Sequence, residues 1–349
     1  MKCLVTGVAG FIGSHLADLL LSLDHEVLGV DDLSAGTMSN IKERLSNDGR
    51  FKFVNLDLSV RKSKLSLATH ARFDRTFDGV ECVFHLASAV GVERILKSSK
   101  DSIESCLGSM SHVLEYADAC KLPLLFTSTS EVYGVSEDLP YREDGKCVLG
   151  CPTKARWVYA TSKLMDEHLA LAYHRELGLN VVIARLFNTV GERQSARYGM
   201  VLPRFVKQAI AHEPLTIYGD GQQTRCFCHV SDTVQALWML MNRLLKDVKY
   251  GAMSKMQQWV PMAHHVSGHI FNVGSTHETS IDALAQIVAA HAEAPPLELR
   301  YGCVRGPGDE EMPRRVPDTS KIKRLCAWEP KVALSEIVRR VFEYERARS

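Results

Sequence analysis

Short apolar runs alternate with longer segments of helical period through the first half of the chain. The helical segments lie at 14–23, 103–119 and 159–176. The runs that have the length of buried strands are 2–6, 26–30, 51–56, 79–86, 122–128 and 180–186. Strands that alternate with helices form a parallel sheet covered on both faces. The pattern therefore predicts an α/β fold with a Rossmann-like doubly wound sheet over residues 1–185.

The pattern changes after residue 186. A helix is expected at 200–212, and strands are expected at 215–218, 222–230 and 269–273. This mixed region, 186–349, predicts a smaller C-terminal substrate-binding lobe interleaved with the edge of the sheet. Residues 246–268 show no clear period and are expected to form a long inserted loop, a feature that is usually functional or interfacial.

The first apolar run opens directly into a glycine-rich turn. Gly7 permits the tight turn, Gly10 allows the backbone to approach a pyrophosphate, and Gly13 allows the helix to pack on the strand. Phe11 and Ile12 lie between the last two glycines, at the start of the helix. An ordinary strand-to-helix turn is the alternative, but the strand, helix and following strand favour a dinucleotide site at the helix N-terminus.

Two carboxylates end the second apolar run. Asp31 and Asp32 stand where an acid accepts a hydrogen bond from a ribose 2′-hydroxyl and repels a 2′-phosphate. No arginine follows in 33–37, so the predicted cofactor is NAD, although a solvated acidic turn remains the alternative. Two further strand ends are expected along the cofactor. They are Asp57 with Leu58, and the small or apolar Leu86, Ala87 and Ser88.

Polar side chains follow the fifth strand, and a tyrosine–lysine pair begins the next long helix. Thr129, Ser130 and Glu131 come at the carboxyl end of that strand, where parallel sheets bind ligands. Tyr159 and Lys163 are four residues apart and share one helix face. The ammonium is expected to favour the phenolate, which makes Tyr159 a candidate general base. A surface cation–aromatic pair is the alternative.

Composition limits the remaining classes. The chain has 349 residues and a formal net charge of +1, which does not indicate a nucleic-acid partner. It starts on a strand and contains no apolar run long enough for a bilayer, so no leader and no membrane association are expected. Ten scattered cysteines without a C-x-x-C predict reduced thiols in a cytoplasmic protein. Cys226 and Cys228 alternate like a strand, and no metal is expected.

Several motifs together resemble the extended short-chain dehydrogenase/reductase family, the NAD-dependent epimerases, dehydratases and decarboxylases of nucleotide sugars. They are TGVAGFIG, VDDLS, STSEVYG, YATSK, ARLFNTVG, LTIYGDGQQTRCFCHVSD and RRVPDTSKIKRLCAWEP, and they cover nearly the whole chain. The resemblance implies that Tyr159 and Lys163 form the oxidoreductase pair and that Thr129 shares the sugar 4-hydroxyl with Tyr159. It also implies that Asn188, Arg193 and Arg225 hold the nucleotide diphosphate or the sugar, with Ser130 beside them.

Residues 129–131 bear on the reaction. The corresponding stretch of dehydratases resembles Thr-Asp-Glu, whereas here Ser130 replaces the aspartate. Simple 4-epimerases generally carry no acid at the third position. Glu131, with Arg156-Trp157 and Arg225, resembles UDP-glucuronate decarboxylases. In that interpretation Arg225 faces the substrate carboxylate and Glu131 assists protonation at C5.

Alternatives remain open at each of these points. Glu131 is alternatively a supporting hydrogen-bonding acid, and Arg225 is alternatively a phosphate clamp. The predicted activity is decarboxylation of UDP-glucuronate to UDP-xylose or its 4-keto pentose. A 4-epimerase of UDP-glucose or UDP-glucuronate is the alternative, and a non-catalytic NAD-binding regulator is a remote one. The resemblance also implies a homodimer that pairs through helices 103–119 and 159–176.

Overall fold

The computed structural model describes residues 1–59, 75–88, 98–196, 200–254, 265–292, 296–303 and 312–348. Its centre is a seven-stranded parallel sheet in the order β11-β6-β5-β4-β1-β2-β3. The strands are β1 (Lys2–Thr6), β2 (Glu26–Asp31), β3 (Phe51–Asn55), β4 (Val80–His85), β5 (Leu124–Thr129), β6 (Val181–Leu186) and β11 (His269–Val273). The predicted Rossmann-like doubly wound fold is confirmed.

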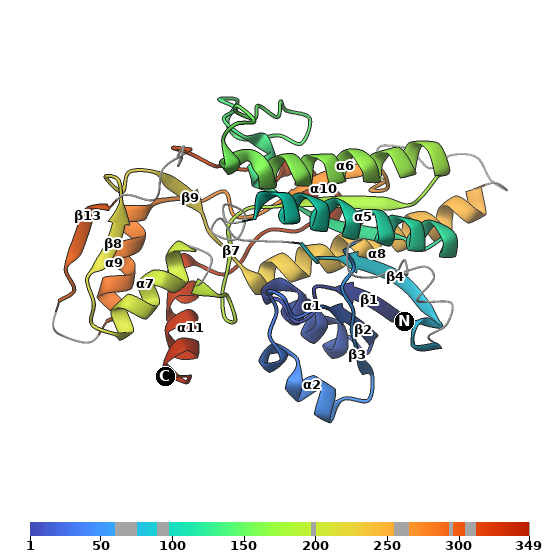
Figure 1. The fold of residues 1–349 in the computed structure, drawn as a ribbon, viewed down its shortest axis with the longest axis horizontal. Coiled ribbons are helices and arrows are strands. Elements are labelled where there is room, and N and C mark those ends of the chain that lie inside the picture. The colour runs from blue at the N-terminus through green and yellow to red at the C-terminus, as the bar shows by residue number, and fades with distance from the viewer. Residues whose placement is uncertain are drawn as a thin grey trace.

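Helices cover both faces of this sheet (Figure 1). The first apolar core lies under α1 (Phe11–Ser22) and α8 (Val230–Ser254), and the second lies under α5 (Ser99–Cys120) and α6 (Val158–Leu177). The central strands read as unbroken apolar runs because each faces a helical layer on either side. The short helix α2 (Lys42–Asn47) lies beside β3, and α10 (Ser320–Cys326) lies beside β11.

A third apolar core belongs to the smaller group of elements at the left of Figure 1. It packs α7 (Val201–Ile210), α9 (Ile281–His291) and α11 (Leu334–Arg346) against the strand pair β8 (Leu215–Tyr218) and β13 (Leu299–Cys303). Two more strand pairs connect this group to the main sheet. They join β7 (Thr189–Val190) to β10 (Cys228–His229) and β9 (Thr224–Cys226) to β12 (Glu278–Ser280).

Two segments differ from their sequence predictions. The strand expected at 222–230 is split into β9 and β10, which pair with different partners. Residues 246–254 continue helix α8, although a loop was expected from 246, and residues 255–264 of that insertion lie outside the described residues. The apolar pattern of the helix is interrupted at Asp247, because this charged residue occupies a buried position. There its carboxylate accepts the Val266 N–H at 2.7 Å.

Residues beyond 186 contribute to both groups of elements. Helix α8 packs on α1, and strand β11 pairs with β6, so the main sheet draws on the C-terminal half of the chain. The division into two lobes near residue 185 stays a prediction. Nine of the ten cysteines are described with free thiols, and no helix in the described part of the chain is long and apolar enough to cross a membrane.

Candidate active site

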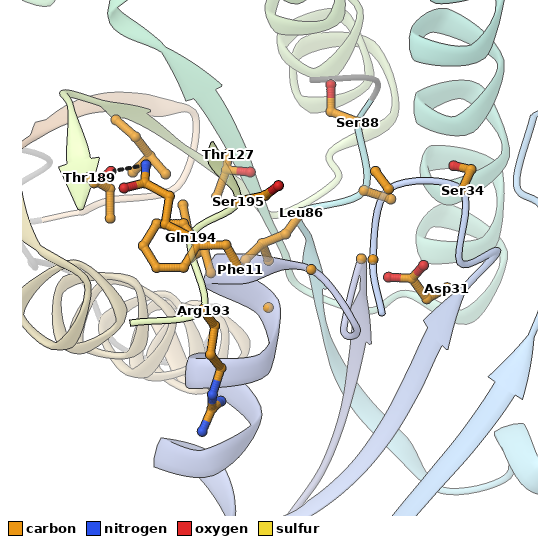
Figure 2. A pocket seen from close by; sticks show the side chains of 18 of the residues that line it. Phe11, Asp31, Ser34, Leu86, Ser88, Thr127, Thr189, Arg193, Gln194 and Ser195 are labelled. Atoms are coloured by element: carbon orange, nitrogen blue, oxygen red, sulfur yellow. Dashed lines mark hydrogen bonds between the residues drawn. The ribbon is translucent and has the colours of Figure 1, made fainter. Parts of the chain in front are cut away.

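A cavity of about 740 Å³ opens at the carboxyl ends of the central strands. Nearly all of the residues predicted for the site line it. They are Gly7, Gly10, Phe11, Ile12, Gly13, Asp31, Asp32, Asp57, Leu58, Leu86, Ala87, Ser88, Thr129, Ser130, Glu131, Tyr159, Asn188 and Arg193. Lys163 and Arg225 are not among the lining residues. Figure 2 shows Asp31 and Ser34 at one end of the cavity, Thr189 and Gln194 at the other, and Phe11 and Leu86 between them.

The glycine-rich turn has no room for side chains. Gly7 has a φ of +71°, and a Cβ there would lie 2.8 Å from the Ala87 nitrogen. A Cβ on Gly13 would lie 2.1 Å from the Gly7 carbonyl oxygen. Gly10 caps α1 without a side-chain hydrogen bond, so no side chain of the cap competes with a phosphate for the first N–H groups of the helix. This turn therefore fits a dinucleotide pyrophosphate.

The acids after β2 hold the neighbouring loops. Asp31 is 8% exposed, and its carboxylate accepts the N–H groups of Ala9 at 3.0 Å and Leu33 at 2.8 Å. Burial raises the pKa of Asp31. Asp32 accepts the Ser34 N–H at 2.9 Å, and Asp57 accepts the Ser59 N–H at 2.8 Å. These three acids line the cavity and give it one polar edge.

Tyr159 and Lys163 lie one turn apart on α6 but on different sides of the cavity wall. Tyr159 lines the cavity, whereas the Lys163 ammonium is buried behind it, 3.9 Å from the Phe126 ring centroid and 3.6 Å from Asp166 Oδ2. Burial raises the pKa of Tyr159, and the charges of Cys106, Glu131 and Asp166 raise it further. The expectation that the Lys163 ammonium would favour the phenolate is therefore wrong for this structure, in which the pKa of Tyr159 is raised.

Glu131 is held between two arginines. It follows Thr129 at the start of η3 (Ser130–Tyr133), and the Thr129 hydroxyl accepts the Glu131 N–H at 3.3 Å. One Glu131 oxygen lies 2.6 Å from Arg156 Nη2, and Arg315 Nη1 donates to the other. Burial opposes the charge of Glu131, but Arg315 and Arg156 outweigh burial and lower its pKa. The cluster holds one carboxylate and two guanidinium groups.

The three residues expected to hold the substrate have different surroundings. Asn188 lines the cavity, and its amide donates to the Cys226 carbonyl at 3.5 Å. The Arg193 guanidinium points away along α1 and pairs with Asp18 at 2.8 Å (Figure 2). Arg225 Nη1 donates to the Thr224 and Met312 carbonyls at 2.7 and 3.0 Å. Contacts of these three residues with a substrate stay predictions.

Arg315 is the residue that the sequence interpretation missed. It lies in the segment 312–319, which has no helical or strand period, and its side chain reaches Glu131 across 184 positions of sequence. The only signal for it was the doubled arginine of the RRVPD motif. The Arg156 side chain also lines the cavity, although it was noted only as part of a resemblance.

The family model for GDP-mannose 4,6-dehydratase matches residues 4–341. The chain belongs to the extended short-chain dehydrogenase/reductase family, and it is an NAD-dependent enzyme of that family.

Individual relatives extend this result. A UDP-N-acetyl-α-D-glucosaminuronate decarboxylase from Bacillus cytotoxicus is 34% identical over 99% of this chain and 98% of its own. UDP-glucuronic acid decarboxylase 1 from Arabidopsis thaliana is 32% identical over 96% of this chain and 68% of its own. The crystal structure of a UDP-glucuronic acid 4-epimerase from Bacillus cereus, in complex with UDP-glucuronic acid and NAD, is 26% identical, with a TM-score of 0.80 over the whole of both chains.

Proposed function

We propose that this enzyme decarboxylates a UDP-hexuronic acid, with UDP-glucuronate as the first candidate substrate. The observation that carries the proposal is the cluster of Glu131, Arg156 and Arg315 on the cavity wall. Glu131 itself is two residues after Thr129 in the sequence. Two guanidinium groups against one carboxylate leave a net positive charge where a second carboxylate can bind in bidentate fashion. The curated relatives that decarboxylate UDP-glucuronate or its N-acetylamino counterpart support this assignment.

The reaction begins at C4 of the sugar. Tyr159 takes the proton of the 4-hydroxyl, which Thr129 orients. NAD, held at the glycine-rich turn, would supply the hydride acceptor for the C4 hydrogen. The resulting ketone is β to the C6 carboxylate. The C5–C6 bond then breaks, carbon dioxide leaves, and the electron pair enters the ketone as an enolate. A proton added at C5 completes the 4-keto pentose.

We propose a different role for Glu131 from the one that the resemblance implied. A carboxylate whose pKa is lowered by two arginines is a poor proton donor at neutral pH. In the ligand-free enzyme Glu131 therefore holds Arg315 and Arg156 in place. When the substrate carboxylate binds Arg315, Glu131 loses one of its cationic partners and its proton affinity rises. Its protonation is thereby linked to the presence of an acidic sugar.

Epimerisation at C4 is the second candidate. It is favoured by the fold match to the UDP-glucuronic acid 4-epimerase, and it uses the same Tyr159 and Thr129. In this reaction the C6 carboxylate stays in place, and Arg315 only positions it. The two candidates differ in whether the C5–C6 bond breaks.

The test is a reaction of the purified enzyme with UDP-glucuronate and NAD in deuterated buffer, followed by proton NMR. A UDP-pentose that carries deuterium at C5 is the expected product. A UDP-galacturonate product would show the epimerase and overturn the decarboxylase. A parallel sample with UDP-N-acetylglucosaminuronate tells whether the pocket prefers a hydroxyl or an acetamido group at C2.

Tyr159→Phe is the control variant for this reaction. It keeps the ring and removes the hydroxyl, so we expect NAD to remain bound and turnover to fall by about 1000-fold or more. Undiminished turnover would refute the assignment of Tyr159 as the base.

We also propose that the enzyme is a homodimer. Helices α5 and α6 pack side by side on one face of the sheet, and their outer surfaces carry Ile103 and Met165, which are 36% and 52% exposed. Two such helices from each copy can form a four-helix bundle. Light scattering is expected to give twice the chain mass of 38.9 kDa, and Met165→Lys is expected to shift it towards the monomer. A wild-type monomer would contradict the proposal.

A further inference from the structure

A chain of buried polar groups lies behind Tyr159. Ser88 contacts the Tyr159 hydroxyl from the cavity side, and its own hydroxyl lies 3.3 Å from the Cys106 sulfur. Cys106 is 3% exposed and contacts the carboxylate of Asp166. Asp166 in turn pairs with Lys163. The chain therefore leads from the candidate base back to the lysine of the same pair.

Among the described residues, the partners of the Asp166 carboxylate are Lys163 and Cys106. It is 1% exposed, and its Oδ1 atom accepts no hydrogen bond from any residue in the described part of the chain. The neighbouring Glu167 is fully engaged by Arg185 and Ser128. Burial raises the pKa of Asp166, because a buried carboxylate is costly. The Lys163 ammonium is the main group that opposes this shift and favours the charged carboxylate.

The groups that face Tyr159 and Asp166 come from every neighbouring element. Helix α5 contributes Cys106, η3 contributes Glu131, and α6 contributes Lys163 and Glu167. Strand β4 contributes His85, which stays neutral because burial and Lys163 lower its pKa to about 3. Arg156 and Arg315 already pair with Glu131. Lys163 is therefore the cation one turn from Tyr159 on α6, and the Asp166 carboxylate lies 3.6 Å from its ammonium.

We propose that Asp166 is a positioning residue for the Tyr159–Lys163 pair, whose buried carboxylate holds the Lys163 ammonium and offsets its charge at the Tyr159 hydroxyl. The inference rests on the proposed role of Tyr159 as the base. The negative charge of Asp166 raises the pKa of Tyr159 and opposes the positive charge of the lysine, which would otherwise stabilise the phenolate. Tyr159 therefore keeps its proton in the ligand-free enzyme, and the ionisation of Tyr159 depends on the electrostatics of the filled site.

Asp166→Asn tests this assignment because it removes the charge and keeps the shape. We expect the ionisation of Tyr159 to move about one pH unit towards acid. The near-ultraviolet phenolate absorbance of D166N, minus that of Y159F/D166N, isolates Tyr159 from the other nine tyrosines of this ten-tyrosine chain and needs no turnover. The acid limb of kcat/KM is expected to shift in the same direction. An unshifted titration would overturn the proposal.

Two further variants control this experiment. Glu176→Gln removes one negative charge from an exposed position of the same helix, and it is expected to leave the titration unchanged. Asp166→Glu keeps the charge and is expected to retain the acid limb of the wild type. If Y159F retained turnover, the proposed function would lose its base, whereas the titration of Tyr159 in D166N would still report on Asp166.

A stability cycle covers the case in which D166N does not fold. Lys163→Met leaves the Asp166 carboxylate buried and unpaired, and the double change K163M/D166N removes both charges. The double variant is expected to melt about 3 °C or more above K163M, because an unpaired buried charge is more harmful than an absent pair. A double variant no more stable than K163M would show that the two residues are not coupled.

Discussion

Two carboxylate–arginine clusters contact the end of β5, at Ser128 and Thr129, and they differ in the number of arginines per carboxylate. Glu167 pairs with Arg185 through both oxygens, at 2.9 and 2.7 Å, and also accepts the Ser128 hydroxyl. Both charged side chains are 3% exposed. Glu131 instead divides its two oxygens between Arg156 and Arg315 and lies on the cavity wall.

We expect the Glu167 cluster to stabilise the fold and the Glu131 cluster to bind the substrate. The Glu167 cluster is neutral, and both oxygens of its buried carboxylate already accept hydrogen bonds from Arg185, with a further one from Ser128. The Glu131 cluster carries one excess positive charge beside a cavity, which favours an incoming anion. Changes in the Glu167 cluster should therefore affect stability, whereas changes in the Glu131 cluster should affect the substrate.

The largest expected effect is on stability. Glu167→Gln leaves the buried Arg185 guanidinium without its counter-ion, so we expect the free energy of unfolding to fall by about 3–5 kcal/mol. Urea denaturation of the ligand-free protein measures this change. Glu176→Gln, on the exposed side of the same helix, should change stability by less than about 0.5 kcal/mol. A small effect of Glu167→Gln would remove the contrast between the clusters.

The second effect is on turnover. Arg315→Met removes the proposed partner of the substrate carboxylate, and kcat/KM for UDP-glucuronate should fall about 100-fold. Arg314→Met is the matched control, because Arg314 is the preceding residue and its half-exposed side chain pairs with Glu278 outside the cavity. Equal losses in both variants would argue for a disturbed segment in place of a lost contact.

Most residues that line this site could be predicted from the sequence, but their ion pairs and pKa shifts could not. The glycine-rich turn, the acids after β2 and the residues at the ends of β4 and β5 were predictable because local spacing places them at one sheet edge. Arg315 was not predictable, because a segment without a period brings it to Glu131 from 184 residues away. The raised pKa of Tyr159 depends on burial and on groups from three elements, so the Tyr-x-x-x-Lys spacing alone could not give it.

The third prediction concerns competition within the Glu131 cluster. Glu131→Gln frees Arg315 from a competing carboxylate, so an acidic sugar should bind more tightly although turnover falls. In a Tyr159→Phe background, which prevents turnover, we expect affinity for UDP-glucuronate to rise about fivefold. Calorimetry with UDP-glucose supplies the control, because that sugar has no carboxylate and its affinity should stay constant. An equal gain for both sugars would point to a general change in the pocket.

The smallest expected effect concerns a third carboxylate, that of Glu192, which pairs with a histidine and not with an arginine. Glu192 is 23% exposed and pairs with Nε2 of His229 at 3.1 Å. Burial opposes the Glu192 charge, but the hydrogen bond from His229 outweighs burial and lowers the pKa of Glu192 to about 2.

A lowered pKa means that this contact stabilises the fold above the unfolded pKa of Glu192 and that the stabilisation is lost as the pH falls towards 2. Glu192→Gln should therefore cost about 1 kcal/mol of unfolding free energy at pH 7, with a cost that disappears between about pH 4.5 and pH 2. Glu329→Gln, which breaks an exposed pair with Lys323, should show no such pH dependence. A cost of Glu192→Gln that persisted at pH 2 would mean that the side chain acts through packing and not through its charge.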